Sequence, residues 1–92
     1  MILSFADKET QTLYETGSSR RFSAVLRVAL RKLDMLAAAT LVETLRVPPG
    51  NRLEKLSGDR EGMWSIRINE QWRICFRRVG ANAEDVEICD YH

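Results

Sequence analysis

The sequence predicts an α+β fold in which two to three N-terminal helices cover one face of a mainly antiparallel, four- to five-stranded sheet. Two observations predict it. In the first half of the chain, apolar residues recur at spacings of three and four, as on one face of a helix. After residue 50 the period changes to two, which is typical of half-buried strands. The 92 residues suffice for one domain, and we expect a single domain over 1–92.

The first predicted elements are a short strand and a capped helix. Met1–Phe5 is apolar and predicts a first strand. Ser4 or Asp7 can cap a helix that continues to about Thr16, and Gly17 is the expected stop.

A longer helix is expected next, followed by a short one. The buried stripe of the longer helix consists of Phe22, Val25, Leu26, Ala29, Leu33 and Leu36. Arg27 and Arg31 are four residues apart and lie on a different face, so both should point outward. Leu41, Val42 and Leu45 favour a short third helix, which the segment 48–51 ends.

The second half of the chain reads as a meander of strands. Leu53–Ser57, Met63–Ile68, Trp72–Arg78 and Glu84–Tyr91 are the expected strands, and 58–62, 69–71 and 80–83 are the connections. Alternation puts Trp64, Ile66, Ile68, Trp72, Ile74 and Phe76 on the helix-covered face. Ser65, Arg67, Arg73, Cys75 and Arg77 fall on the opposite face.

Charge is unevenly distributed although the formal net charge is only +1. Segment 20–32 is basic without any acid, and segment 80–92 is acidic without any Lys or Arg. Most basic residues are arginine, whose planar fork fits phosphate oxygens. We expect Arg20, Arg21, Arg27 and Arg31 to contact nucleic-acid phosphates. A solvated helix face, or a surface for an acidic protein partner, fits these residues too.

The expected location is the cytoplasm. No apolar run is long enough to span a membrane, and the first residues lack the basic region of a signal peptide. In that compartment Cys75 and Cys89 should be reduced, and we interpret both as small core residues.

Several kinds of active site are excluded by residue counts and spacing. One histidine and two cysteines without CxxC spacing do not fit an ordinary zinc site. No GxxxxGK[ST] or GxGxxG motif is present. We therefore expect neither a metal nor a small-molecule cofactor.

The remaining candidate site combines the last three residues with an arginine-bearing sheet face. In an antiparallel pair of strands, Arg73 at the start of one lies near His92 at the end of the other. Metal-free RNA cleavage requires proton transfer from the 2′-hydroxyl and to the 5′-oxygen, which suits His92. It also requires stabilisation of phosphorane charge, which suits Arg73.

Each of these residues also has a purely structural interpretation. His92 can be a frayed terminus, and Tyr91 can simply pack. Arg73 can pair with Glu87 or Asp90 on a solvated sheet face. Asp90 falls in phase with Val86 and Ile88, which predicts burial and an orienting or capping role.

The segments 56–76 and 86–92 resemble the HigB group of the RelE/ParE toxin superfamily. The most specific motifs are Gly-Asp-Arg-Glu-Gly (58–62), Asn-x-Gln-Trp-Arg-Ile (69–74) and the ending Asp-Tyr-His (90–92). The resemblance implies a RelE-like fold and metal-independent cleavage of mRNA in the A site of the 30S ribosomal subunit, which inhibits translation. It also implies a HigA-type antitoxin as protein partner.

The same resemblance implies roles for individual residues. Arg73 would stabilise the scissile phosphate, His92 would transfer a proton, Tyr91 would stack on or hydrogen-bond RNA, and Asp90 would orient its neighbours. Ser57 stands where some relatives have lysine, which leaves Lys55 or Arg60 as substitute phosphate ligands. Arg67 and Arg77, on the sheet face of Arg73, complete the predicted RNA-contacting set.

Two other functions remain open on this fold, because fold alone does not fix function. One is a ParE-like toxin that binds DNA gyrase without RNA chemistry. The other is a non-catalytic interaction module.

Overall fold

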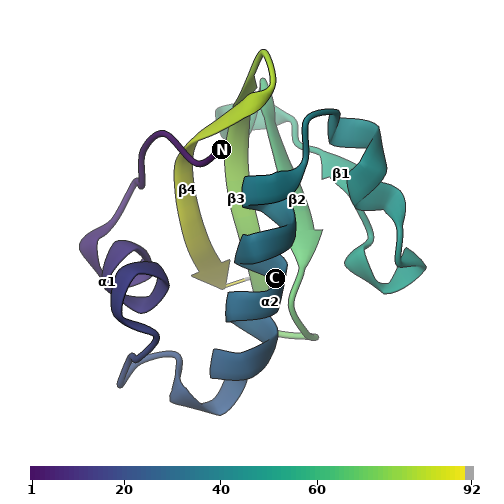
Figure 1. Cartoon of the computed structure of the whole chain (residues 1–92). Coiled ribbons are helices and arrows are strands. Elements are labelled where there is room, and N and C mark those ends of the chain that lie inside the picture. The colour runs from purple at the N-terminus through teal and green to yellow at the C-terminus, as the bar shows by residue number, and fades with distance from the viewer. Residues whose placement is uncertain (91–92) are drawn as a thin grey trace.

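A four-stranded antiparallel meander with strand order β1-β2-β3-β4 forms the centre of the computed structural model, which describes residues 1–90. The strands are β1 (Glu54–Lys55), β2 (Met63–Arg67), β3 (Trp72–Val79) and β4 (Asn82–Asp90). Two helices, α1 (Lys8–Thr16) and α2 (Leu26–Ala38), precede them in the chain. In Figure 1, α2 crosses one face of the sheet and α1 lies beside β4. The predicted α+β class is confirmed.

The first predicted strand is wrong in detail. Residues 1–5 form only two isolated parallel bridges to β4, Ile2 with Ala83 and Phe5 with Val86. The third predicted helix is a 3₁₀ turn over Val42–Arg46. The strand expected over residues 53–57 is reduced to the two residues of β1.

The caps of α1 follow local side-chain chemistry. The Asp7 carboxylate accepts a hydrogen bond of 3.1 Å from the Thr10 backbone N–H, so Asp7 is the N-cap. Ser4, the alternative, accepts from the backbone N–H of Asp85 at 2.9 Å instead. Gly17 ends the helix with φ 75°, and its N–H donates to the Leu13 carbonyl at 2.8 Å.

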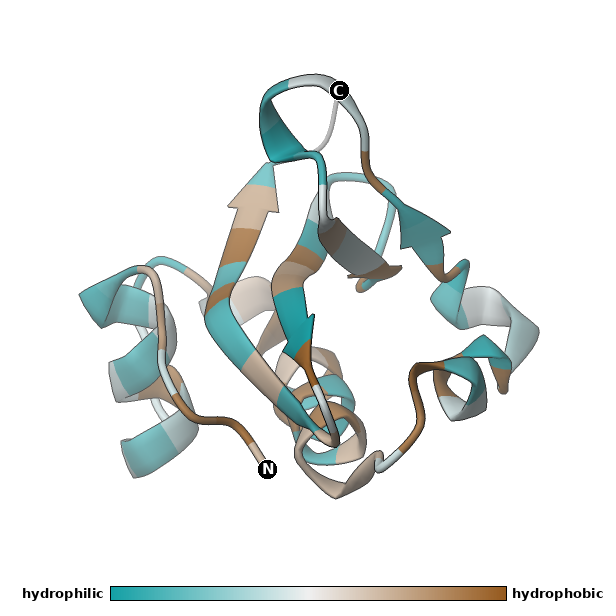
Figure 2. Ribbon diagram, turned by 90° about the horizontal axis from the view of Figure 1, so that it is seen from above, coloured by the Kyte–Doolittle hydropathy of each residue, from teal (hydrophilic) through white to brown (hydrophobic). Residues whose placement is uncertain are grey.

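The core lies between α2 and the sheet. Its fully buried members include Phe22, Leu33, Ile66, Ile74 and Phe76, and burying each such side chain contributes about 1.5–3 kcal/mol. Figure 2 shows hydrophobic and hydrophilic residues alternating along β3 and β4, as expected for strands covered on one face. The predicted division of residues 64–77 between two faces is therefore confirmed.

One basic residue of segment 20–32 is inside the molecule. Lys32 is only 5% exposed, and its amine donates to the Asn51 side-chain oxygen. The Asn51 amide in turn donates to the Leu45 carbonyl at 3.1 Å. Burial, assisted by the neighbouring charge of Arg31, lowers the pKa of Lys32 below 10.5. This buried pair ties the segment that leads into β1 to α2.

Candidate functional site

The sheet face opposite α2, here called the open face, gathers most of the predicted site. It carries Ser65 and Arg67 of β2, Arg73, Cys75 and Arg77 of β3, and Glu87 and Cys89 of β4. The register places Arg67 opposite Arg73, and Arg73 opposite Cys89. Arg77 is four residues further along β3, roughly 13 Å away, where its Nε lies 3.5 Å from an Asp85 carboxylate oxygen.

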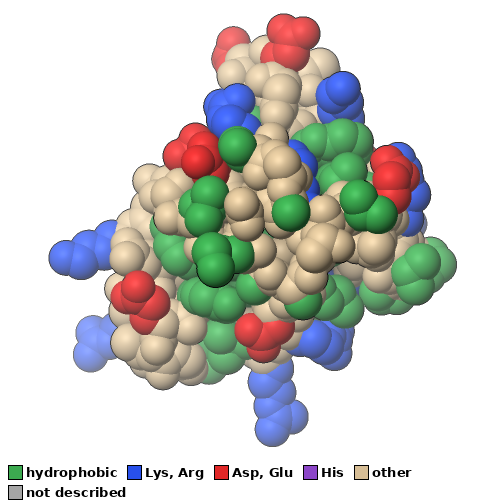
Figure 3. All heavy atoms as spheres, turned by 45° about the horizontal axis from the view of Figure 1, so that its top comes forward, with side chains coloured by type: hydrophobic (Ala, Val, Ile, Leu, Met, Phe, Trp, Pro, Cys, Tyr) green, Lys and Arg blue, Asp and Glu red, His purple; other side chains and the backbone are tan. Residues whose placement is uncertain are grey.

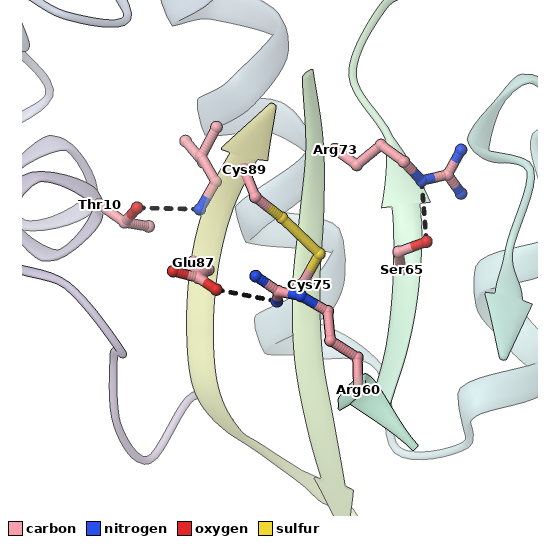
Figure 4. The surroundings of a disulfide bond; sticks show 8 residues. Thr10, Arg60, Ser65, Arg73, Cys75, Glu87 and Cys89 are labelled. Carbon is pink, nitrogen blue, oxygen red and sulfur yellow. Dashed lines mark hydrogen bonds and ion pairs between the residues drawn. A yellow bond between two sulfur atoms is a disulfide. The ribbon is translucent and has the colours of Figure 1, made fainter. Parts of the chain in front are cut away.

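Arg73 is buried on this face, with 3% of its surface exposed. Its Nε donates to the Ser65 hydroxyl at 2.8 Å, and an Nη donates to the backbone carbonyl of Arg52 at 2.8 Å. Its other Nη lies 3.8 Å from a Glu54 carboxylate oxygen. Figure 4 shows the guanidinium directed toward β2 and Ser65. Several contacts fix the plane of this guanidinium, which a charge-stabilising arginine requires.

The expectation that both cysteines are reduced is wrong for this structure, although Cys75 is buried as predicted and Cys89 is partly buried. Cys75 and Cys89 form a disulfide between β3 and β4, on the open face and outside the hydrophobic core. The two residues are diagonal neighbours, since Cys75 pairs in register with Glu87 and Arg73 pairs with Cys89. Diagonal side chains on one face of an antiparallel pair are close enough to meet.

Arg60 also belongs to the open face, and Lys55 does not. Arg60 lies in the short turn Gly58–Arg60, and its guanidinium reaches across β3 to Glu87, with a nitrogen–oxygen distance of 2.9 Å. Glu87, considered from the sequence as a partner of Arg73, forms its ion pair with Arg60. Lys55 pairs in register with Trp64, and its amine lies 5.7 Å from the centre of the Trp64 ring on the helix-covered side. Of the two substitutes for a lysine at position 57, only Arg60 lies beside Arg73.

Two hollows of about 180 Å³ each adjoin Arg73. The disulfide pocket is lined by Arg60, Ser65, Arg73, Cys75, Cys89 and Asp90, among others. The arginine pocket is lined by Arg52, Glu54, Arg67, Asn69, Glu70 and Arg73. Arg73 thus forms part of the wall of both.

Asp90 is exposed, contrary to the predicted burial. It is the last residue of β4 and pairs with the half-buried Trp72, at the end of the sheet rather than over its core. It nevertheless lines the disulfide pocket with Arg73. The other two predicted catalytic residues, Tyr91 and His92, lie outside the described residues, so the closeness of Arg73 and His92 stays a prediction.

The four arginines of segment 20–31 are exposed. One of them, Arg21, contacts Trp72, which pairs with Asp90 at the end of the sheet that carries the candidate site. The Arg21 guanidinium lies 5.7 Å from the centre of the Trp72 ring and 3.0 Å from a Glu9 carboxylate oxygen. Arg20, Arg21 and Lys8 line a hollow of about 290 Å³ that shares no residue with the two pockets beside Arg73. Arg27 and Arg31 project from α2. Figure 3 shows basic side chains projecting around the rim of the face in view.

Three residues that hold Arg73 were not predicted from the sequence. Ser65 had a usable signal, because strand alternation placed it on the face of Arg73. Glu54 and Arg52 had none, since their positions depend on how the chain enters β1. Within residues 1–90, no three His, Cys, Asp or Glu side chains converge as a metal site would require. No helix in that range is long and apolar enough to cross a membrane.

Comparison with known proteins identifies the family. The family described as RelE-like toxin of type II toxin-antitoxin system HigB matches residues 3–92. The chain belongs to the HigB family of RelE-like toxins. The Toxin HigB-1 of Vibrio cholerae serotype O1 is 42% identical over 81 residues, which cover 86% of this chain and 85% of that one. The Endoribonuclease HigB of Proteus vulgaris is 36% identical over the full length of both chains.

Solved structures agree with the HigB assignment at the level of fold. The chain matches the YoeB-YefM toxin-antitoxin complex of Staphylococcus aureus with a TM-score of 0.58, 17% identity and coverage of 100% of this chain and 98% of that one. It matches the YoeB/ParE toxin of Agrobacterium tumefaciens with a TM-score of 0.57, 22% identity and coverage of 99% and 98%. The predicted RelE-like fold is confirmed.

Proposed function

We propose that this HigB-family toxin is an endoribonuclease that cleaves mRNA on the ribosome, in the A site of the 30S subunit, and thereby inhibits translation. The observation that carries the proposal is the immobilised guanidinium of Arg73 between two pockets of the open face. The full-length relative from Proteus vulgaris, named an endoribonuclease, supports the same activity. A toxin that acts only by binding a protein has no need of such a site.

The proposed chemistry is attack of the 2′-hydroxyl on the adjacent phosphate, without a metal ion. The 2′-hydroxyl loses its proton, the bond from phosphorus to the 5′-oxygen breaks, the 5′-oxygen gains a proton, and a 2′,3′-cyclic phosphate remains. Arg73 stabilises the negative charge that develops on the phosphorane oxygens. His92 transfers a proton and Tyr91 stacks on or hydrogen-bonds the RNA, while Asp90 orients these neighbours. Arg60 supplies a second positive charge at the disulfide pocket, where it takes the part of the lysine that some relatives have at position 57.

The proposed partner that neutralises the toxin is a HigA-type antitoxin. The family belongs to type II toxin–antitoxin systems, and one solved neighbour is itself a complex of a toxin with its antitoxin. We place the action of the toxin in the cytoplasm, where ribosomes and mRNA are found.

The decisive experiment uses purified ribosomes carrying a defined, end-labelled mRNA. The wild type should cut in the A-site codon, and the same RNA free in solution should be cut poorly. Few catalytic residues are proposed, so the reaction depends on the ribosome to orient the substrate. Deletion of His92 should lower single-turnover cleavage by about 10²–10⁴-fold while thermal unfolding stays the same.

Three outcomes would count against this proposal. Equal cleavage of free and ribosome-bound RNA would remove the ribosome from the mechanism. A His92-deleted protein that melts normally and cuts at the wild-type rate would remove His92. Absence of any cleavage, combined with inhibition of DNA gyrase supercoiling, would favour the gyrase-binding function instead.

A further inference from the structure

We propose that Arg52, Arg67 and Arg73 form a binding site for a second RNA phosphate, adjacent to the phosphate that is cleaved. The inference rests on the proposed function and adds a substrate-positioning site to it. The Arg52 side chain, which lines the arginine pocket, joins the residues proposed to contact RNA.

The strongest observation is the placement of two like charges. Arg67 and Arg73 are direct register partners on β2 and β3, so their side chains leave the open face side by side. Like charges opposite one another destabilise an antiparallel pair. Arg67 turns its Nε toward the Asn69 carbonyl at 3.0 Å, and Arg73 turns its Nε toward Ser65, but both residues line the arginine pocket. A bound anion between them would remove this repulsion.

Arg52 adds a third positive charge, carried on an anchored stretch of main chain. Its backbone carbonyl accepts the hydrogen bond from Arg73, and its φ of 45° is unusual for a residue other than glycine. The neighbouring Asn51 is fully buried and bonded to Lys32, so the main chain that presents Arg52 is anchored to α2. The arginine pocket therefore has anchored main chain on the side of β1 and the strand pair β2–β3 on its other side.

Glu54 and Glu70 partly neutralise the pocket when RNA is absent. Three arginines and two glutamates leave a net charge of +1 in its lining. The Glu54 contact with Arg73 is long, at 3.8 Å, and Glu54 is about half exposed, so an RNA phosphate can displace this carboxylate at little cost. Forked arginine donors match a phosphate with two oxygens better than they match a distant carboxylate.

The position of the arginine pocket indicates that it binds a phosphate next to the scissile one. The arginine pocket and the disulfide pocket share Arg73 as a common wall. Two anion sites on either side of one guanidinium fit neighbouring phosphates of a single strand. The second phosphate would then hold the RNA in line for attack at the first, which is a positioning effect.

The test combines charge-neutral substitutions with a chemically altered RNA. In Arg52→Gln/Arg67→Gln the main-chain carbonyl that holds Arg73 is kept, so the fold should be preserved and thermal unfolding checks this. Single-turnover cleavage on the ribosome is measured against toxin and salt concentration. We expect half-saturation at a higher toxin concentration. The slope of log affinity against log salt concentration should be flatter by about 0.7 for each lost phosphate contact. Arg46→Gln removes an exposed, Glu43-paired arginine outside both pockets and should leave both measurements unchanged.

A methylphosphonate next to the scissile phosphate identifies the contact. This neutral linkage should raise the toxin concentration at half-saturation several-fold for the wild type. It should have no additional effect on the double variant, since the contact is already absent there. If the wild type tolerates the methylphosphonate at both neighbouring positions, or if the double variant retains the wild-type salt slope, the proposed second site does not exist.

A binding measurement separates this inference from the proposed function. Inorganic phosphate, followed by NMR of the arginine side-chain N–H groups, should shift the signals of Arg52 and Arg67 and leave that of Arg46 in place. Shifts without any cleavage by the wild type would overturn the proposed function and keep the anion site. Cleavage by the wild type with neither phosphate shifts nor a methylphosphonate effect would keep the function and overturn the site.

Discussion

Arg60, in the turn before β2, and Glu87, on β4, are joined by an ion pair of 2.9 Å that passes over β3. Glu87 is the register partner of Cys75, and the Arg60 side chain passes beside the Cys75 end of the disulfide. This explains why Cys75 is only 4% exposed although it lies on the face without a helix. A turn that the sequence presents as a simple connection thus covers part of the site.

Removing the Arg60 side chain should expose the disulfide. Arg60→Ala should increase the rate of reduction by dithiothreitol several-fold, because the incoming thiolate must reach a sulfur atom. The free energy of unfolding should fall by less than about 1 kcal/mol, since both partners of the ion pair are partly exposed. Arg77→Ala, which breaks the exposed pair with Asp85, is the matched control. Equal reduction rates in wild type and Arg60→Ala would show that Arg60 does not shield the sulfurs.

The disulfide should contribute measurably to stability. The cysteines are 14 residues apart, and closing a loop of this length stabilises a fold by about 3 kcal/mol. Urea unfolding of the oxidised protein should therefore occur at higher denaturant concentration than that of the protein kept in dithiothreitol. Cys75→Ser/Cys89→Ser should unfold like the reduced protein and should not respond to dithiothreitol. A wild type whose midpoint is the same with and without reductant would contradict the prediction.

Substitution of Arg73 should affect stability as well as activity. Arg73→Ala leaves the buried Ser65 hydroxyl and the Arg52 carbonyl without their donor, which costs about 1–3 kcal/mol. Cleavage should fall by about 10²–10³-fold at temperatures where the variant is still folded. Ser65→Ala keeps the charge and loses only one orienting contact, so it should reduce cleavage less and should lower the rate constant more than the affinity. Wild-type cleavage by a folded Arg73→Ala would exclude the proposed role.

The burial of Lys32 should make the free energy of unfolding depend on pH in the alkaline range. Burial lowers its pKa in the folded state, so the folded protein binds fewer protons than the unfolded one in the window just below pH 10.5. The free energy of unfolding should therefore rise through this window as the pH increases, and the cost of burying the charged amine is fully present at lower pH. Lys32→Met lacks this titration. The measurement is the difference between wild type and Lys32→Met in urea unfolding from pH 7 to pH 10.5, and a constant difference would contradict it.

The alternation of apolar and polar residues in the sequence was sufficient to assign strand residues to the two faces of the sheet. The alternation of Trp64, Ser65 and Ile66 puts the correct residues in the core and on the open face because strand geometry depends only on neighbouring residues. The helix signals at Asp7 and Gly17 were equally local and equally correct.

Contacts between strands could not be predicted in the same way. The disulfide depends on the register of β3 against β4, which alternation alone does not fix. The burial of Lys32 depends on a partner 19 residues away, on a segment with no regular pattern. Lys55 and Arg60 are close in sequence, but one lies on each side of the sheet, because the short β1 ends between them.

The first residues of the chain also determine which border of the sheet can accept another strand. Backbone groups of residues 1–6 form hydrogen bonds with Ala83 and Val86 on the outer border of β4, and the Thr10 hydroxyl accepts from the Ile88 N–H at 3.0 Å. The opposite border is formed by β1, which is only two residues long. Borders that are occupied or very short are poor templates for intermolecular strand pairing. In its folded form this toxin should therefore resist amyloid-like self-association, and a partner protein should bind mainly through side chains rather than by extending the sheet.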